Sequence, residues 1–370
     1  MPPHPALGQA KPAPRLSPMK PVIVITMGDP AGIGPEIIVK ALSKSLGNRV
    51  RQLCRPLVVG NRAVMEKAAK RLKSSIKIRS ITDPKTAIFS KSGMNLIEPN
   101  NTDLSRLVIG RPNAAGGQAA VEAIRTAVRL AMARRVAAIV TAPISKEALH
   151  AAGFPYPGHT ELLAELSGAK EVGMLMAAPL PGAIHSRLTP PASRLASQLR
   201  ILLATTHLAL RDLPQRLTRE RVQSAIRLAH QAATGPFKIR RPRLAVTGLN
   251  PHAGEGGLFG QEEKEVIRPA VEAARRDGIP VVGPIPADSL IRQAAEGKYD
   301  MVIAMYHDQA LIPIKLLAFG RAVNVTVGLP FIRTSPDHGT AYDIAGKGIA
   351  DPGSLIEAIR MAVSLSKKKR

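Results

Sequence analysis

A short apolar run that stops at a cluster of polar side chains constrains this chain more than any other feature. The run Met301-Val302-Ile303-Ala304-Met305 is followed at once by Tyr306-His307-Asp308-Gln309. A bounded apolar run of this length predicts a parallel strand that is buried on both faces. In open α/β sheets, ligands bind at the carboxyl ends of the strands. The sequence therefore predicts a functional site that begins at residue 306.

The residues that follow carry more charge than a core segment needs. A second apolar strand is predicted from Ala322 to Leu329, and around it lie Lys315, Arg321, Arg333 and the pair Asp337-His338. Charged side chains are seldom fully buried unless they are paired. We therefore predict that residues 301–348 form the centre of the site.

Strands and helices alternate along the rest of the chain. Apolar, β-branched segments predict strands, and apolar residues at helical spacing predict helices. The predicted strands are 21–26, 55–60, 136–141, 201–206, 243–248 and 281–285, and the predicted helices are 37–46, 62–72 and 115–133. This alternation is typical of an α/β fold, and a chain of 370 residues is long enough for two domains.

The amino terminus and the cysteine content indicate where such a chain works. Residues Met1 to Lys20 are rich in Pro, basic, and without a continuous apolar segment, so we predict a disordered basic tail and no secretory signal. No apolar run reaches the roughly 18 residues of a membrane span, so no membrane partner is expected. The single Cys54 excludes an intramolecular disulfide and suits a reducing compartment, which predicts a cytoplasmic location.

The strong positive charge leaves one alternative of another class open. A net charge of +25 and a pI near 10.8 are compatible with nucleic-acid binding. However, the cations are scattered except for Lys367-Lys368-Lys369-Arg370, and aromatic residues make up only 3% of the chain, so few bases could stack on it. We therefore expect no nucleic-acid partner, and we interpret the charge as favouring phosphorylated substrates.

Three histidines each stand just past a predicted strand. His207, His252 and His307 follow the strands that end near residues 206, 248 and 305. Strand ends of a parallel sheet lie along one edge, so the three imidazoles can converge, and imidazole suits zinc, cobalt and related divalent ions. Taken singly, a His at a strand end is more often a hydrogen-bonded structural residue than a metal ligand.

Two loops and one helix start also carry candidate site residues. Gly28-Asp29-Pro30-Ala31-Gly32-Ile33-Gly34-Pro35-Glu36 joins a strand to a helix and could present backbone N–H groups to an anion, although its glycines do not match the dinucleotide fingerprint. Lys146 follows the strand 136–141 and is either a solvated charge or a site residue. His159 opens a predicted helix, where it could face a phosphate or carboxylate.

Several of these motifs, in one order, resemble a known enzyme family. Tyr306-His307-Asp308-Gln309, the segment Gly328–Ser335 and the segment Asp337–Ala341 are similar to 4-hydroxythreonine-4-phosphate dehydrogenases of the pyridoxal phosphate pathway, and the loop Gly28–Glu36 matches their opening motif. The resemblance extends from about Pro21 to about Ile356. The segment from His338 to Gly346 is also similar to the nucleotide loop of isopropylmalate and isocitrate dehydrogenases.

The resemblance implies a fold and a division into domains. It implies two α/β/α domains of the isocitrate/isopropylmalate dehydrogenase type with the active-site cleft between them. The first domain would comprise residues 21–145 and 325–370, and the second would comprise residues 146–324 with the metal ligands and dimer contacts. The chain departs from the family in a Pro-rich segment at 178–199, which reads as an extra loop or a lengthened strand connection.

The resemblance also implies a reaction. The enzyme would use NAD or NADP and one divalent ion (Zn, Co or Mg) to oxidise 4-(phosphooxy)-L-threonine to 2-amino-3-oxo-4-(phosphooxy)butyrate. Loss of CO₂ would then give 3-amino-2-oxopropyl phosphate for pyridoxine 5'-phosphate biosynthesis. The alternative is a sister enzyme that oxidises a phosphorylated four-carbon sugar acid such as 4-phospho-erythronate or phospho-threonate; Leu311 and Gly346 favour the vitamin pathway.

Roles for individual residues follow from the same resemblance. The implied metal ligands are His207, His252 and His307, and the implied substrate contacts are His159, Thr160, Lys315, Asn324 and Arg333. For Arg333, a structural salt bridge is the alternative. The implied cofactor contacts are His338, Gly339, Thr340 and Asp343, and Lys146 or a metal-bound water is the candidate base. A homodimer is implied, with His207 and His252 from one subunit and His307 from the other completing each site.

Overall fold

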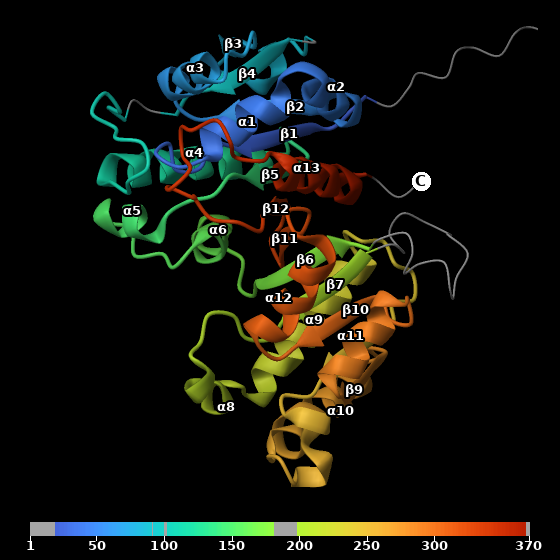
Figure 1. Cartoon of the computed structure of the whole chain (residues 1–370). Coiled ribbons are helices and arrows are strands. Elements are labelled where there is room, and N and C mark those ends of the chain that lie inside the picture. The colour runs from blue at the N-terminus through green and yellow to red at the C-terminus, as the bar shows by residue number, and fades with distance from the viewer. Residues whose placement is uncertain (1–18, 91, 100–101, 181–197, 368–370) are drawn as a thin grey trace, which may run out of the picture.

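The computed structural model describes residues 19–90, 92–99, 102–180 and 198–367. Within these ranges one 12-stranded sheet runs through the molecule in the order β3-β4-β2-β1-β5-β12-β11-β6-β7-β10-β8-β9. Strands β1 to β5 lie in one half of an elongated molecule and β6 to β10 in the other, with β11 and β12 between them (Figure 1). Most of the predicted tail (1–18) and of the Pro-rich segment (181–197) lies outside the described residues.

The strands are mostly parallel, as the sequence predicted. Their bounds are β1 Val22–Thr26, β2 Arg55–Val59, β3 Lys77–Ser80, β4 Gly93–Ile97, β5 Ala138–Thr141, β6 Gly173–Pro179, β7 Gln198–Leu203, β8 Leu244–Thr247, β9 Val281–Ile285, β10 Met301–Ala304, β11 Val323–Val327 and β12 Ile332–Pro336. The pairs β12–β11, β11–β6 and β6–β7 are antiparallel. In sequence, the Pro-rich segment lies between β6 and β7.

The helices cover both faces of this sheet. Their bounds are α1 Gly34–Leu42, α2 Lys44–Leu53, α3 Arg62–Arg71, α4 Ala114–Met132, α5 Lys146–Ala151, α6 His159–Ser167, α8 Leu213–Arg216, α9 Arg219–Thr234, α10 Arg268–Arg276, α11 Ala287–Ala295, α12 His307–Ala318 and α13 Gly353–Ser366. The helix predicted at 37–46 instead ends at Leu42, because Ser43 takes an extended conformation before α2 begins. No helix in the described ranges is long and apolar enough to cross a membrane.

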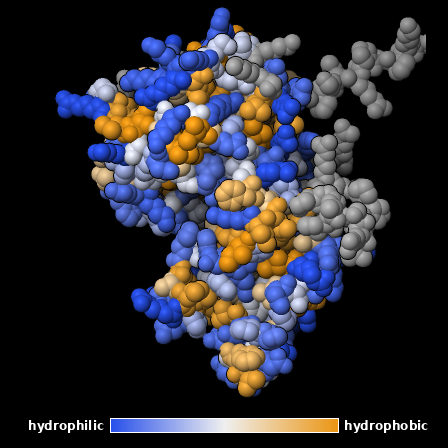
Figure 2. All heavy atoms as spheres, viewed as in Figure 1, coloured by the Kyte–Doolittle hydropathy of each residue, from blue (hydrophilic) through white to orange (hydrophobic). Residues whose placement is uncertain are grey.

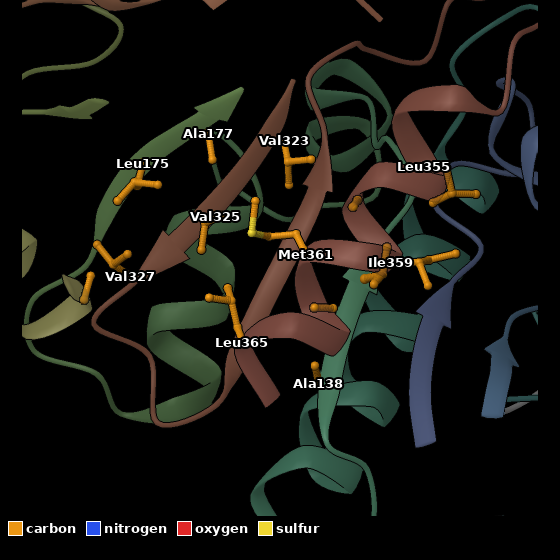
Figure 3. Packing of buried hydrophobic residues seen from close by; sticks show 14 of the residues in the cluster. Ala138, Leu175, Ala177, Val323, Val325, Val327, Leu355, Ile359, Met361 and Leu365 are labelled. Atoms are coloured by element: carbon orange, nitrogen blue, oxygen red, sulfur yellow. The ribbon is translucent and has the colours of Figure 1, made fainter. Parts of the chain in front are cut away.

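Helix α13 packs the two halves together. Its residues Leu355, Ile359, Met361 and Leu365 belong to one buried cluster with Ala138 of β5 and with Val323, Val325 and Val327 of β11. Figure 3 shows Met361 and Leu365 beside β11, with Ala138 on the neighbouring part of the sheet. Burying a Leu, Ile or Met side chain stabilises a fold by roughly 1.5–3 kcal/mol, so this helix holds β11 and β12 in place under the site.

The predicted domain boundaries remain a prediction. The first, between residues 145 and 146, falls at the N-cap of α5, where Ser145 Oγ accepts a hydrogen bond of 3.2 Å from the Ala148 N–H. The second, between residues 324 and 325, falls inside β11, which pairs with β12 on one side and β6 on the other.

Candidate active site

A cavity of about 460 Å³ opens between the two halves. This volume suits a small-molecule ligand. Ten of the thirteen predicted site residues line it: Lys146, His159, Thr160, His207, His307, Lys315, Asn324, Arg333, His338 and Gly339. The strand ends of β5, β7 and β10 supply one wall, as expected for a site at the carboxyl edge of a parallel sheet. His252, Thr340 and Asp343 do not line the cavity.

The floor of the cavity holds a buried guanidinium. Arg333 is 2% exposed, and its Nε and Nη2 atoms donate to Thr141 Oγ1 at 3.2 and 2.6 Å, while Nη1 donates to Thr326 Oγ1 at 2.8 Å. Both acceptors are neutral, and no carboxylate of the described residues forms an ion pair with Arg333. The alternative salt bridge is therefore absent from these residues. Burial lowers the pKa of Arg333 to about 9, while the Glu161 carboxylate opposes that shift.

Buried charges are normally paired, because removing an ion from water costs several kcal/mol. Arg333 is held by its strand register, in which it faces Thr326 of β11 and Ile139 of β5. Neither Thr141 nor Thr326 was predicted from the sequence, since a Thr at a strand end has no distinguishing pattern. A buried guanidinium that lines a cavity and has only neutral partners can form an ion pair with an anionic ligand.

Three further polar atoms of residues that line the cavity lack hydrogen-bond partners among the described residues. His159 Nε2 and Asn324 Oδ1 are buried without a partner among the described residues, and so is His338 Nε2. Burial lowers the pKa of His159 well below its ordinary value, and the charge of Arg333 lowers it further, so this imidazole is neutral at pH 7. Because buried polar groups are usually satisfied, orphan atoms that line a cavity indicate a polar ligand.

His207 and His307 lie side by side at the cavity. Their ring centroids are 5.6 Å apart, and Thr205 Oγ1 donates to the Met305 carbonyl at 2.7 Å, which ties the ends of β7 and β10 together. Burial lowers the pKa of His207, the charges of Lys146 and His307 lower it further, and Glu161 opposes them. His207 is therefore neutral at pH 7, the form in which imidazole binds metal.

The carboxylate of Asp308 lies beside one of these two histidines. His307 Nδ1 lies 2.7 Å from Asp308 Oδ1. When Nδ1 donates to a carboxylate, Nε2 is left free as the metal-binding atom, and such a partner is a common feature of metal-ligating histidines. The donor set therefore fits a divalent ion, but two imidazoles leave its coordination incomplete.

His252 lies apart from the other two histidines. It is exposed, on the turn η3 (Pro251–Gly257), with its ring 6.3 Å from that of Phe259. Across the part of the chain that the structure describes, no group of three or more His, Cys, Asp or Glu side chains could hold a metal ion. The structure thus groups the histidines differently from our expectation, because His307 rather than His252 accompanies His207 in one chain.

The strand order and the turn explain this grouping. Strand β10 lies between β7 and β8, so the residue after β10 reaches the residue after β7. After β8, five consecutive residues from His252 to Gly256 have positive φ values of 44–82°, and this left-handed turn carries His252 away from the strand ends.

The loop that begins at His338 is fastened to the Gly-rich loop Gly28–Glu36. Tyr342 Oη donates to Asp29 Oδ2 at 2.6 Å, and the Ile33 N–H donates to the Thr340 carbonyl at 3.0 Å. Burial and the Asp29 carboxylate raise the pKa of Tyr342. Gly28 has φ +72°, and a Cβ there would lie 2.4 Å from the Pro143 carbonyl oxygen, so only glycine fits. The pairing of Asp29 with Tyr342 was not predicted, although both residues lie inside motifs that the resemblance covers.

The chain resembles known proteins over nearly its whole length. The family model of the pyridoxal phosphate biosynthetic protein PdxA matches residues 52–362. A 4-hydroxythreonine-4-phosphate dehydrogenase from Geobacter metallireducens is 47% identical over 351 residues, covering 95% of this chain and 97% of that protein. A D-threonate 4-phosphate dehydrogenase from Cupriavidus necator is 46% identical over 350 residues, covering 94% and 98%.

A solved structure agrees with these relatives. The crystal structure of 4-hydroxythreonine-4-phosphate dehydrogenase from Klebsiella pneumoniae has a TM-score of 0.82 and 42% identity, and the match covers 94% of this chain and 100% of that one. The predicted α/β dehydrogenase fold is thereby confirmed. The chain belongs to the PdxA family and is a dehydrogenase.

Proposed function

We propose that this chain oxidises 4-(phosphooxy)-L-threonine at its 3-hydroxyl group, with NAD or NADP as the hydride acceptor and a divalent ion in the site. The product, 2-amino-3-oxo-4-(phosphooxy)butyrate, is a β-keto acid and loses CO₂ to give 3-amino-2-oxopropyl phosphate, a step of pyridoxine 5'-phosphate biosynthesis. The observation that carries this proposal is the buried Arg333 guanidinium, which has only neutral partners and faces a cavity beside two neighbouring imidazoles.

The charge of the cavity suits a phosphorylated acid. Four cationic side chains line it, Lys146, Arg221, Lys315 and Arg333, against two carboxylates, Glu161 and Asp337. This excess of positive charge complements a phosphate and a carboxylate on one small molecule. Arg333 offers bidentate hydrogen bonds and Lys315 a point charge. His159 Nε2 and Asn324 Oδ1 have no hydrogen-bond partner in the part of the chain that the structure describes. Thr160 follows His159 at the start of α6.

We propose that the divalent ion (Zn, Co or Mg) is held by His207 and His307 of one chain and by His252 of a second copy. A bound divalent ion supplies Lewis acidity, which lowers the pKa of a coordinated hydroxyl. The exposed position of His252 supports a ligand role toward another chain. Lys146 begins α5 and lines the same cavity, so it is our candidate general base for the 3-hydroxyl, a role that requires its side chain to react as the neutral amine.

Exposed apolar residues support a homodimer. Ile312, Leu316 and Phe319 lie on and just after α12 at helical spacing and are 65%, 83% and 83% exposed, and Leu258 and Phe259 beside His252 are 74% and 49% exposed. Exposed apolar side chains gathered along one helix, as on α12, are typical of protein interfaces. Figure 2 shows a group of hydrophobic residues near the middle of the view, in the region of α12, and further groups on both halves of the molecule.

We assign the nucleotide to the loop that begins at His338. His338 and Gly339 line the cavity, whereas Thr340 and the exposed Asp343 lie beyond it. His338 and Gly339 are therefore our candidates for contacts to the nicotinamide end of the cofactor. Thr340 and Asp343 are our candidates for contacts to its adenosine end. The bonds to Asp29 and Ile33 hold this loop in place for the cofactor. We keep the cytoplasmic location as a proposal, which the single cysteine of the chain, Cys54, supports.

A second candidate substrate is D-threonate 4-phosphate. The relative from Cupriavidus necator carries that name and is nearly as similar to this chain as the relative from Geobacter metallireducens. The two substrates share the phosphate, the carboxylate and the hydroxyl that is oxidised, so the site described above serves either. They differ at C2, where the first has an amino group and the second a hydroxyl group.

The metal requirement is tested by removing and restoring the ion. Protein freed of metal with a chelator should form no NADH from 4-(phosphooxy)-L-threonine, and activity should return on addition of Zn²⁺, Co²⁺ or Mg²⁺. The reason is that the 3-hydroxyl must lose a proton as hydride leaves, which is difficult at pH 7 without a Lewis acid. NADH production is followed by absorbance, with metal content measured on the same sample. Full activity of metal-free protein would remove the ion from the proposal.

A further inference from the structure

The turn Pro251–Gly257 has a backbone conformation that its sequence alone does not maintain. Five consecutive residues, His252 to Gly256, lie in the left-handed region. Glycine adopts this region freely, but His252, Ala253 and Glu255 carry side chains that disfavour it. Strained backbone of this kind persists only where the surrounding structure holds it, and it often marks a functional site. The question is which residue holds the turn.

A buried carboxylate sits where the turn begins. Glu263 is 3% exposed and opens a short π-helical turn, η4 (Glu263–Ile267). Its Oε1 accepts hydrogen bonds from the backbone N–H groups of Leu249 and Asn250, both at 2.7 Å, and its Oε2 accepts one of 3.0 Å from Asn250 Nδ2. Leu249 and Asn250, just before the turn, therefore donate three hydrogen bonds to the Glu263 carboxylate.

Two glycines allow the backbone to close around this carboxylate. A Cβ at Gly254 would lie 2.6 Å from Glu263 Oε2, and a Cβ at Gly248 would lie 3.1 Å from Oε1. Gly254 is part of the left-handed turn and Gly248 comes directly after β8. Glu263 thus contacts the chain on both sides of residues 249–253, and it fixes the direction in which His252 leaves the strand end.

We propose that Glu263 is the positioning residue for His252: it holds the left-handed turn so that the imidazole faces out of its own chain and reaches the metal pair His207 and His307 of a second copy. This inference rests on the proposed function, because it takes His252 as a metal ligand. Without the carboxylate, the N–H groups of Leu249 and Asn250 lose their acceptor, the turn relaxes to less strained conformations, and the imidazole is no longer preorganised. The affinity for the ion should then fall.

The test is a Co²⁺ titration of the metal-free, full-length protein, read by the visible absorption of the bound ion. Four variants are compared with the wild type: Glu263→Ala, Glu263→Gln, His252→Ala and Glu265→Gln. Losing a group that orients a metal ligand typically weakens binding about 10- to 100-fold, and we expect that loss for Glu263→Ala. Glu263→Gln should lose less, because its amide oxygen can still accept from the two backbone N–H groups. Glu265 is exposed on the same π-helical turn, so Glu265→Gln should bind Co²⁺ like the wild type.

Each outcome is decisive when folding is checked by circular dichroism at the titration temperature. A folded Glu263→Ala protein that binds Co²⁺ as tightly as wild type overturns the inference. If Glu263→Ala does not fold, Glu263→Gln decides the matter: it should bind Co²⁺ more weakly than wild type, because its amide nitrogen cannot accept from Asn250 Nδ2, and wild-type binding overturns the inference. Weakened binding in His252→Ala together with unchanged binding in the Glu263 variants rejects the positioning role alone. Unchanged binding in His252→Ala removes His252 from the metal site, and the proposed ligand set fails with it.

Discussion

Mixing the His207→Ala protein with the His252→Ala protein, under conditions that exchange subunits, should restore about a quarter of wild-type activity. Each variant alone should be nearly inactive, because each site lacks one proposed ligand. In a mixed dimer, one site carries both lesions and the other carries neither, since His207 and His307 come from one chain and His252 from its partner. Random pairing makes about half of the dimers mixed, and half of their sites are intact. NADH formation is measured after exchange is verified with differently tagged chains.

A second mixture provides the matched control. The His207→Ala and His307→Ala lesions affect histidines whose rings are 5.6 Å apart in the same chain, so every site of that mixed dimer keeps one lesion and no activity should return. Recovery in this mixture, with none in the first, would support the opposite grouping, in which His207 accompanies His252. No recovery in either mixture would reject a site shared between subunits.

Replacing Arg333 by Met should abolish most substrate recognition without destabilising the protein. Truncating one partner of a buried, hydrogen-bonded charge pair costs about 2–5 kcal/mol, so kcat/KM for the phosphorylated substrate should fall at least about 30-fold. The free energy of unfolding should stay equal or rise, because the free chain loses a buried charge that forms no ion pair within the described residues. Arg333→Lys should be intermediate in kcat/KM, since it keeps the charge and loses the planar fork.

Arg200 is the matched control for this substitution. It is also buried, at 3% exposed, but its Nη1 atom donates to the Asp300 carbonyl at 3.2 Å and its guanidinium lies 5.0 Å from the Phe237 ring, away from the cavity. Arg200→Met should therefore lower the free energy of unfolding, measured with urea, and leave kcat/KM close to wild type. If Arg333→Met instead behaved like Arg200→Met, the guanidinium of Arg333 would be structural.

The sequence predicted the site well where regular structure places the residues. Lys146, His207 and His307 follow strands of a parallel sheet, and the carboxyl ends of such strands meet whatever the intervening sequence. Predicting Arg333 as a substrate contact needed the family resemblance, because a lone Arg carries no spacing signal. Its lack of an ion-pair partner, which supports that role, could be seen only when the packing of Thr141 and Thr326 was known.

The sequence was less informative about buried polar residues and about the position of His252, which depends on a left-handed backbone conformation. Strand β12 was missed because Arg333, Thr334 and Ser335 look like an exposed motif, yet they are buried and Thr334 Oγ1 donates to the Ala358 carbonyl at 2.8 Å. The direction of His252 depends on positive φ at Ala253 and Glu255, which residue preferences argue against. Such a conformation is imposed by distant groups such as Glu263, and no local pattern reports it.

A comparison of kcat/KM values among the candidate substrates decides which molecule this enzyme oxidises. Metal-loaded, full-length protein is given NAD or NADP with 4-(phosphooxy)-L-threonine, D-threonate 4-phosphate or 4-phospho-erythronate, and reduced nucleotide is measured for each. The proposal predicts the highest kcat/KM for 4-(phosphooxy)-L-threonine, with CO₂ released in equal amount to the reduced nucleotide. A higher kcat/KM for either sugar acid would contradict it and would assign this site to the oxidation of phosphorylated four-carbon sugar acids.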